Sequence, residues 1–270
     1  MTERPEDIQK RLAGLDDIGQ VVGALRAIAA GHVGEARTAT KAVATYAQTV
    51  EDALSLLTAE DRSPLGQGPG LLLVVGTAQG FSGSLSARIA EAARLTMRDD
   101  PGLIVVGNRT LEMLKAEGAE VLWSSDLPGH PASVAELASS VTDALVRHAV
   151  DNPGPIRAVI APLHAGVPPE VRKLFPPPPL PEGTAPRGTR PITTMTAADL
   201  ITGLLQEALF AAVIRALLEG AAAEAQARVE AMARAQSNLR SRREDVERQY
   251  QQARQEGMTT EMIELAVSRL

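Results

Sequence analysis

A long run of helix-forming residues without proline occupies the C-terminal part of the chain. Between Leu200 and Arg254 there is no proline and only two glycines, whereas Ala, Leu, Glu, Gln and Arg are frequent. These residue types are strong helix formers, so we expect one C-terminal helix over residues 196–270. At about 1.5 Å per residue the helix would be roughly 100 Å long, far longer than the helices of compact domains. Other parts of the chain must therefore support it.

The N-terminal part of the sequence can supply that support. Residues 6–57 also lack proline, and we expect a second long helix over residues 1–60. Its apolar side chains recur every three or four residues and so form one stripe: Ile8, Leu12, Leu15, Ile18, Val22, Leu25, Ile28 and Val33. We expect the two terminal helices to form a long antiparallel coiled coil around a middle domain. Two helices of an ordinary bundle are the alternative.

The middle of the chain, residues 68–194, alternates between strand and helix signals. Apolar runs typical of buried parallel strands occur at residues 71–75, 103–107, 121–123 and 156–161. Helices are expected between them at residues 85–98, 110–117 and 132–150. The order βαβαβαβ predicts an α/β domain with a small parallel sheet covered by helices. Residues 192–194 are expected to add an edge strand, and Thr196 or Asp199 to cap the final helix.

Residues 175–191 are rich in proline, including four consecutive prolines from Pro176 to Pro179. Such a segment favours extended polyproline geometry and has little apolar surface to bury. We interpret it as a surface linker between the sheet and the final helix. A recognition peptide for an aromatic groove is the alternative.

Composition excludes several classes of function. The chain has no cysteine, so disulfides, thiol catalysis and cysteine-ligated metals are excluded, and its net charge of −6 gives no support to nucleic-acid binding. The acidic N-terminus lacks the apolar core of a signal peptide, and no apolar run approaches the roughly 20 residues that span a bilayer. We expect a soluble protein that is cytoplasmic or peripheral on the cytoplasmic face of a membrane.

The candidate chemical sites are weak. The glycine-rich turn at residues 76–84 precedes a helix and could bind an anion, but it matches neither the dinucleotide fingerprint nor a lysine-bearing phosphate loop. Ser82 misses the nucleophile-elbow pattern by one residue. The four histidines, His32, His130, His148 and His164, show no helical metal-ligand spacing. We expect no catalytic residues, no metal and no cofactor.

The C-terminal helix carries an excess of arginine between residues 228 and 254. One interpretation is a basic stripe that faces acidic loops of a partner, because arginine can hold a carboxylate through two parallel bonds. The other is a solvated helix with local ion pairs, such as Glu244 with Arg248, each worth only a few tenths of a kcal/mol. The sequence leaves both open.

Several motifs of this helix, taken in order, resemble one known family. They are Ala227-Arg228, Ala231-Met232, Asn238, Tyr250, Ala253-Arg254-Gln255, Thr259 and Glu261, and the turn after residue 75 adds Gly80, Gly83 and Leu85. Their order and spacing are similar to those of the gamma subunit of rotary F-type ATP synthases, and the resemblance runs from end to end. In that family two terminal helices form an antiparallel coiled coil around a small α/β domain.

The resemblance implies a mechanical rather than a catalytic role. The chain would be the central shaft that couples ion flow through a membrane ring of c subunits to ATP chemistry in a hexamer of alpha and beta subunits. It would also contact the epsilon subunit, and would reach the membrane only through the complex, on the cytoplasmic face of a bacterial plasma membrane. The apolar residues near the C-terminus, Met262, Ile263, Leu265 and Val267, would lie in an apolar bearing of the hexamer. The positions that the family uses for subunit contacts or helix bracing correspond here to Leu25, Arg228, Arg254, Gln255, Thr259 and Glu264.

The N-terminal helix departs from the family pattern. Gly23 and His32 replace the usual lysines, and Leu25 replaces a methionine. These changes keep the apolar packing and remove charge, so the chain looks like a divergent gamma subunit. Two interpretations outside this family remain: a coiled-coil adaptor that holds an α/β module, and a Rossmann-like protein that binds a ligand at the turn of residues 76–84.

Overall fold

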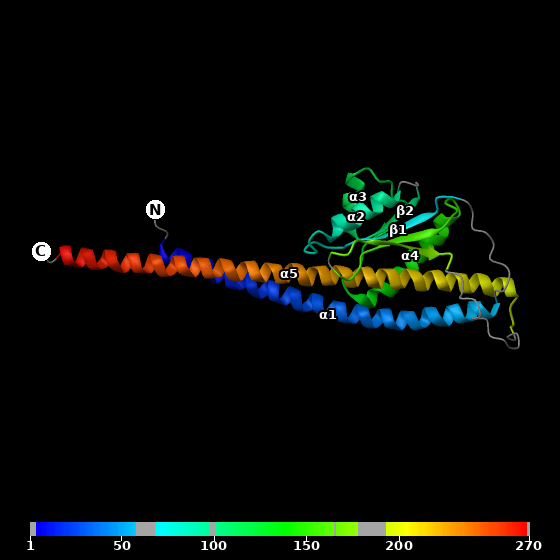
Figure 1. Ribbon diagram of the computed structural model, residues 1–270, viewed down its shortest axis with the longest axis horizontal. Helices are drawn as coiled ribbons and strands as arrows, with labels where there is room; N and C mark the ends of the chain where they lie inside the picture. The colour runs from blue at the N-terminus through cyan, green and yellow to red at the C-terminus, as the bar shows by residue number, and fades with distance from the viewer. Residues whose placement is uncertain (1–3, 58–67, 98–100, 165, 178–192, 269–270) are drawn as a thin grey trace. The chain divides into compact units, whose positions relative to one another are not determined.

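The computed structural model describes residues 4–57, 68–97, 101–164, 166–177 and 193–268 (Figure 1). The chain divides into two compact units. One consists of Met1–Ala29 with Val229–Leu270, and the other is Ala30–Arg228. We refer to them as the terminal unit and the central unit.

Both predicted terminal helices are present. Helix α1 spans Pro5–Leu57 and helix α5 spans Ala197–Val267, which is 71 residues. Each helix contributes to both units. Thr196 caps α5, because its Oγ1 accepts a hydrogen bond of 3.2 Å from the backbone N–H of Asp199. Asp199, the other predicted cap, lies in the first turn, where a negative charge favours the helix dipole.

In the terminal unit α1 and α5 run antiparallel. Arg26 contacts Gln236 and Asp16 contacts Arg243, so residue numbers fall along one helix as they rise along the other. Ile8, Val246 and Ala253 are buried between the helices, and Leu12, Leu15 and Tyr250 pack around them. In the central unit the two helices are also in contact, because the hydroxyl of Tyr46 on α1 donates to Glu207 on α5. The predicted pairing of the two terminal helices is confirmed.

The central unit contains a five-stranded sheet in the order β3-β2-β1-β4-β5. The first four strands are parallel, as predicted, and β5 pairs antiparallel with β4. Helices follow the first three strands in alternation, with a short 3-10 turn before α4. The elements are β1 (Leu71–Val75), α2 (Leu85–Thr96), β2 (Gly102–Val106), α3 (Asn108–Ala116), β3 (Trp123–Ser125), η2 (Pro131–Ser133), α4 (Val134–Ala149), β4 (Ile156–Ile160) and β5 (Glu170–Phe175).

The edge strand was predicted in the wrong place. Thr193 and Thr194 are not in a strand, and Ile192 lies outside the described residues. The added strand is β5 instead, which has the sequence Glu-Val-Arg-Lys-Leu-Phe and is largely exposed. Its three charged residues hid it from a search for apolar runs. Charged side chains suit an edge strand, because they discourage pairing with another chain.

Helices cover both faces of the sheet (Figure 1). Because successive side chains of a strand point to opposite faces, Leu71, Leu73 and Val75 lie on one side, whereas Leu72 and Val74 lie on the other. The first face packs against α4 and against the part of α5 that contains Val213 and Leu217, and the second packs against α2 and α3. The core is therefore a three-layer α/β arrangement in which a segment of α5 forms part of one layer.

One stretch of α5 is long and apolar enough to cross a membrane, by length and composition alone. The sequence was not expected to contain such a stretch. Within this helix Leu209, Val213, Leu217 and Leu218 are buried in the core of the central unit. Part of this helix therefore packs in a protein core, and length and composition alone are weak evidence for a membrane span.

Candidate functional site

The glycine-rich turn that follows β1 is held tightly against β2 and α3. The N–H of Gly76 donates to the carbonyl of Val106 at 2.8 Å, and the N–H of Thr77 donates to Oγ1 of Thr110 at 3.0 Å. A Cβ on Gly76 would lie 2.5 Å from Cβ of Thr110, so only glycine fits there. The turn is thus anchored at its start, and its next two N–H groups point toward α5.

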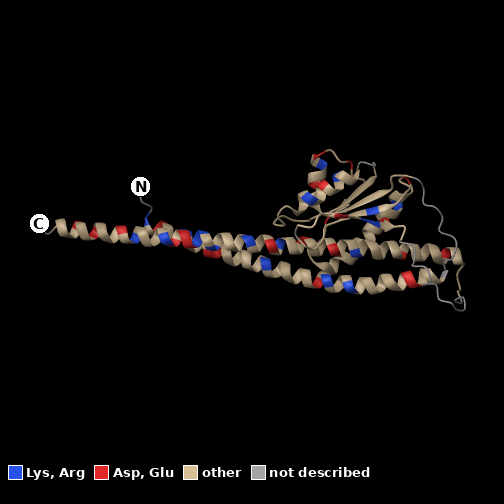
Figure 2. Cartoon of the chain, viewed as in Figure 1, with Lys and Arg blue, Asp and Glu red and all other residues tan. Residues whose placement is uncertain are grey.

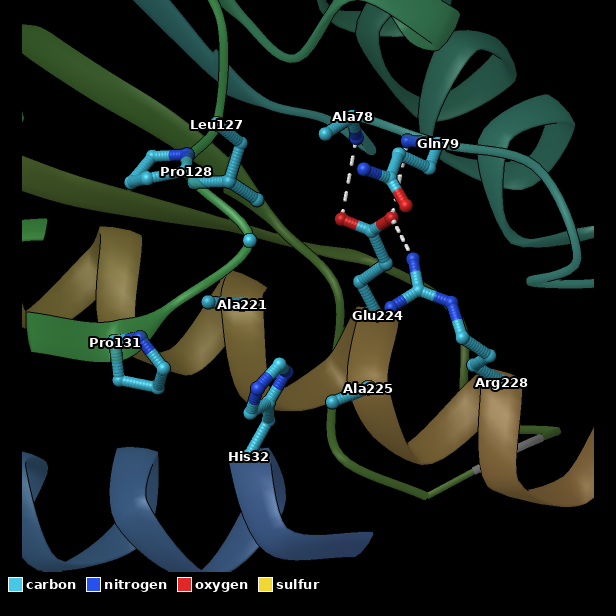
Figure 3. Close-up of a pocket in the computed structure, with 11 residues that line it drawn as sticks. His32, Ala78, Gln79, Leu127, Pro128, Pro131, Ala221, Glu224, Ala225 and Arg228 are labelled. Carbon is cyan, nitrogen blue, oxygen red and sulfur yellow. Dashed lines mark hydrogen bonds and ion pairs between the residues drawn. The ribbon is translucent and has the colours of Figure 1, made fainter. Parts of the chain in front are cut away.

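A buried carboxylate from α5 accepts these two hydrogen bonds (Figure 3). The N–H of Ala78 donates to Oε2 of Glu224 at 3.1 Å, and the N–H of Gln79 donates to Oε1 at 3.2 Å. Nη2 of Arg228 donates to the same Oε1 at 2.7 Å. We call the set of Ala78, Gln79, Glu224 and Arg228 the Glu224 clasp. Two backbone donors and one guanidinium provide the pairing that a buried carboxylate requires.

The clasp changes the interpretation of the turn as an anion site. The N–H groups that could have held a phosphate hold the carboxylate of Glu224, whose side chain is only 6% exposed. The cavity beside it has a volume of about 20 Å³, enough for about one water molecule. His32, Leu127, Pro131, Ala221 and Ala225 line that cavity with the clasp residues (Figure 3). A phosphate group bound to these two N–H groups would have to displace Glu224.

Two of the four histidines, far apart in the sequence, meet beside this cavity. The rings of His32 on α1 and His130 before η2 pack edge to face, with centroids 5.6 Å apart. Nδ1 of His130 accepts a hydrogen bond of 3.1 Å from the N–H of Ala132, and its Nε2 lies 3.5 Å from Oε2 of Glu35. Among the described residues, no three His, Cys, Asp or Glu side chains converge to bind a metal ion. The cluster braces α1 against the loop before η2.

The structure separates the site residues carried over from the family into two groups. Arg228 points inward to Glu224, and its side chain is only 17% exposed. Arg254, Gln255, Thr259 and Glu264 are all exposed on the last turns of α5, and Leu25 of α1 is 37% exposed. Arg228 is therefore largely buried within the central unit, whereas the other five residues are exposed.

Several arginines of the C-terminal helix form ion pairs with carboxylates of the same chain. Arg243 donates to Asp16 at 2.8 Å and lies 3.4 Å from Glu247, and Arg240 lies 4.0 Å from Glu244. Arg248 pairs with Asp245 rather than with the predicted Glu244, because residues three apart also face each other on a helix. Figure 2 shows acidic and basic residues intermixed along the helices of the terminal unit. For these arginines the solvated-helix interpretation is favoured over a basic stripe.

Glu224 was not identified from the sequence. Its partners Ala78 and Gln79 are separated from it by 146 and 145 residues, and a backbone N–H carries no sequence signature. One signal was available, since a glutamate four residues before Arg228 lies on the same helix face. That spacing predicts the local ion pair and not the contact with the turn.

These features define a class of fold: two long terminal helices that pair antiparallel, with a small α/β domain built around one stretch of them. The family model described as ATP synthase matches residues 4–268. The chain is 26% identical to the ATP synthase gamma chain of Geobacter metallireducens and 24% identical to the mitochondrial ATP synthase subunit gamma of Pichia angusta, with 96% of both chains covered in each case. The chain belongs to the gamma-subunit family of ATP synthases.

Solved structures agree with this assignment at the level of the fold. The chain is similar to a chain of the Euglena gracilis mitochondrial ATP synthase rotor, with a TM-score of 0.64 and 16% identity over 94% of this chain and 98% of that one. A chain from the central stalk and c-ring of the Tetrahymena thermophila mitochondrial ATP synthase gives a TM-score of 0.56 at 16% identity, over 80% of this chain and 99% of that one. The predicted fold class, an α/β domain with a long antiparallel coiled coil, is confirmed.

Proposed function

We propose that this chain is the central rotor shaft of an F-type ATP synthase. Its rotation would couple ion flow through a membrane ring to ATP synthesis or hydrolysis in a hexamer of alpha and beta subunits. The observation that carries this proposal is the family match over residues 4–268, which includes both terminal helices and the α/β domain. A protein that shared only a coiled coil or only a Rossmann-like domain with the family would match over part of its length.

The chain acts without catalytic chemistry of its own. The sequence contains no Gly-Lys-Ser or Gly-Lys-Thr phosphate loop, and the donors of the turn at residues 78 and 79 hold Glu224. In the proposed complex, ATP chemistry would belong to the beta subunits. The shaft would act by making different contacts with each of the three catalytic sites in turn, because differential contacts select among conformations of a partner.

The end of α5 is the part of the shaft that best suits insertion into the hexamer. Met262, Ile263, Leu265 and Val267 have exposed fractions of 71, 59, 65 and 67%. A group of exposed apolar side chains of this kind usually marks an interface. We infer that these residues form the surface that turns in the apolar bearing of the hexamer. Apolar contact is attractive but not directional, so it would allow the helix end to turn.

The polar contacts with the hexamer are assigned to residues of the terminal unit. Arg254, Gln255, Thr259 and Glu264 are exposed near the C-terminus, and Leu25 supplies partly exposed apolar surface on α1. Exposed arginine and amide side chains can form hydrogen bonds with acidic loops as the shaft turns. Arg228 differs from them, since its partner is Glu224 within the same unit. We assign it to bracing and not to subunit contact.

At the membrane side the shaft would contact the epsilon subunit and the ring of c subunits. The protein would then be peripheral on the cytoplasmic face of a bacterial plasma membrane and would touch the membrane only through the complex. This location predicts that the protein sediments with membranes when the ring is present and is soluble when the ring subunits are deleted.

Co-expression with the alpha and beta subunits of the same organism tests the proposal. Native mass spectrometry should find a complex of three alpha, three beta and one copy of this chain. If alpha and beta are folded and soluble but this chain remains apart from them, the rotor assignment fails. Self-association of the isolated chain would then support the adaptor alternative.

A further inference from the structure

We propose that the Glu224 clasp is the contact through which rotation of α5 is passed to the α/β domain. Glu224 would act as a positioning residue of the rotor: it makes no contact with nucleotide, and it fixes the rotational setting of α5 against the sheet. The inference rests on the proposed function, because torque passes between α5 and the sheet only if the chain turns. Gly220, Glu224 and Arg228 lie on the helix face that meets the turn, and the contacts around them are mainly apolar.

Gly220, Glu224 and Arg228 follow one another at intervals of four residues and so lie on one face of α5. Gly220 packs against the end of β1, where an added Cβ would lie 2.3 Å from Cγ1 of Val75. One turn later Glu224 reaches the N–H groups of Ala78 and Gln79, directly after that strand. The close approach at Gly220 brings the next turn of α5 within hydrogen-bonding distance of the loop.

The apolar contacts between α5 and the sheet are poorly suited to resist rotation. Val213, Leu217 and Leu218 pack through apolar surface, which is attractive but not directional. Hydrogen bonds weaken steeply as their angle departs from linearity. Turning α5 about its axis would therefore break the clasp before it separated the apolar surfaces. The clasp is placed to define the angle between helix and sheet.

A second polar link joins α5 to the sheet but is more accessible to water. Nη1 of Arg172 on β5 lies 2.7 Å from Oε2 of Glu219, with side-chain exposures of 35 and 24%. In the clasp the exposures of Arg228 and Glu224 are 17 and 6%. Water and salt screen exposed pairs more strongly than buried ones. The clasp should therefore contribute more to the rigidity of the joint.

Torsional stiffness of the assembled rotor tests this inference. The chain has no cysteine, so a cysteine introduced at the exposed Lys115 of α3 gives one attachment point on the α/β domain. The accessible cysteines of the hexamer are removed, and the hexamer is fixed to a surface. A bead is attached to the introduced cysteine, and the spread of its angular position is recorded without ATP. Glu224→Ala should widen the spread, while unloaded ATP hydrolysis stays unchanged. Added formate, a small carboxylate that fits the vacated space, should narrow the spread again in this variant alone.

Matched variants separate this role from general damage. Glu244→Ala removes the same side chain from an exposed position of the same helix and should leave the spread unchanged. Glu224→Gln serves if the alanine variant does not assemble. It keeps the side-chain volume and one hydrogen-bond acceptor, and it should also widen the angular spread. A wild-type spread in the Glu224 variants, or a widening that formate leaves in place, would overturn the inference. If ATP does not turn the wild-type bead, the rotor assignment itself fails.

Discussion

Single residues decide how closely α5 approaches the sheet, and Gly220 is the clearest case. Replacing it with alanine places a Cβ 2.3 Å from Cγ1 of Val75, a fully buried residue. Overpacking of this kind costs about 1–3 kcal/mol, which exceeds the gain of up to about 1 kcal/mol that alanine brings to a helix. Gly220→Ala should therefore lower the midpoint of urea unfolding.

Gly203 provides a matched control for that substitution. It lies in the same helix, but an added Cβ would meet nothing within 4 Å. Gly203→Ala should leave the stability unchanged or raise it by up to about 1 kcal/mol. Equal urea midpoints for the two variants would contradict the packing assigned to Gly220.

Tyr46 joins α1 to α5 in the central unit and should titrate unusually. The hydrogen bond to Glu207 is the main cause that raises the pKa of Tyr46 to about 12, with smaller contributions from burial and from the charge of Glu207. In a Tyr250→Phe background, absorbance of the phenolate should rise near pH 12, and Tyr46→Phe should abolish that rise. A transition near the ordinary tyrosine pKa of about 10 would contradict the contact.

The same pKa sets the direction of a stability effect. Because the folded-state pKa of Tyr46 is raised, its contribution is fully present below the unfolded value of about 10 and is lost as the pH rises toward 12. Tyr46 is 39% exposed, so screening by water keeps this contribution small.

At the scale of elements, the sequence predicted the long helices and the strands with strongly apolar sequences. Helices α1 and α5 follow from proline-free stretches with helical spacing, and strands β1, β2 and β4 follow from apolar runs. Strand β5 was missed because an edge strand exposes its side chains and needs no apolar pattern. The Glu224 clasp was missed for a related reason: its donors are backbone groups, which the topology and not the residue type brings to α5.

The last turns of α5 are separable from the folding of the α/β domain. Every described residue from Arg254 onward is exposed, and the buried cluster of the terminal unit ends at Ala253. Deleting residues 257–270 should leave the unfolding transition of the α/β domain unchanged, because no described core residue is removed. The same deletion should reduce assembly with the hexamer or the coupling of ATP hydrolysis to ion pumping, measured in reconstituted vesicles. Unchanged coupling in the truncated complex would count against the bearing assigned to these residues.

At the scale of the whole molecule, physical reasoning and family resemblance supplied different parts of the assignment. Composition and motif spacing excluded thiol chemistry and a phosphate loop, but they could not distinguish a shaft from an adaptor. The ordered motifs of α5 made that distinction, and the match over residues 4–268 confirmed the family. The departures at Gly23 and His32 both lie at contacts within the chain: an added Cβ at Gly23 would lie 3.3 Å from Nε2 of Gln236, and His32 packs on His130.

Direct observation of rotation tests the central assignment. A bead attached through Lys115→Cys to this chain, in a complex with surface-fixed alpha and beta subunits, should turn in one direction when ATP is supplied and stop when ATP is removed. A complex that contains the chain and hydrolyses ATP while the bead shows only random motion would contradict the assignment of this protein as the rotor shaft.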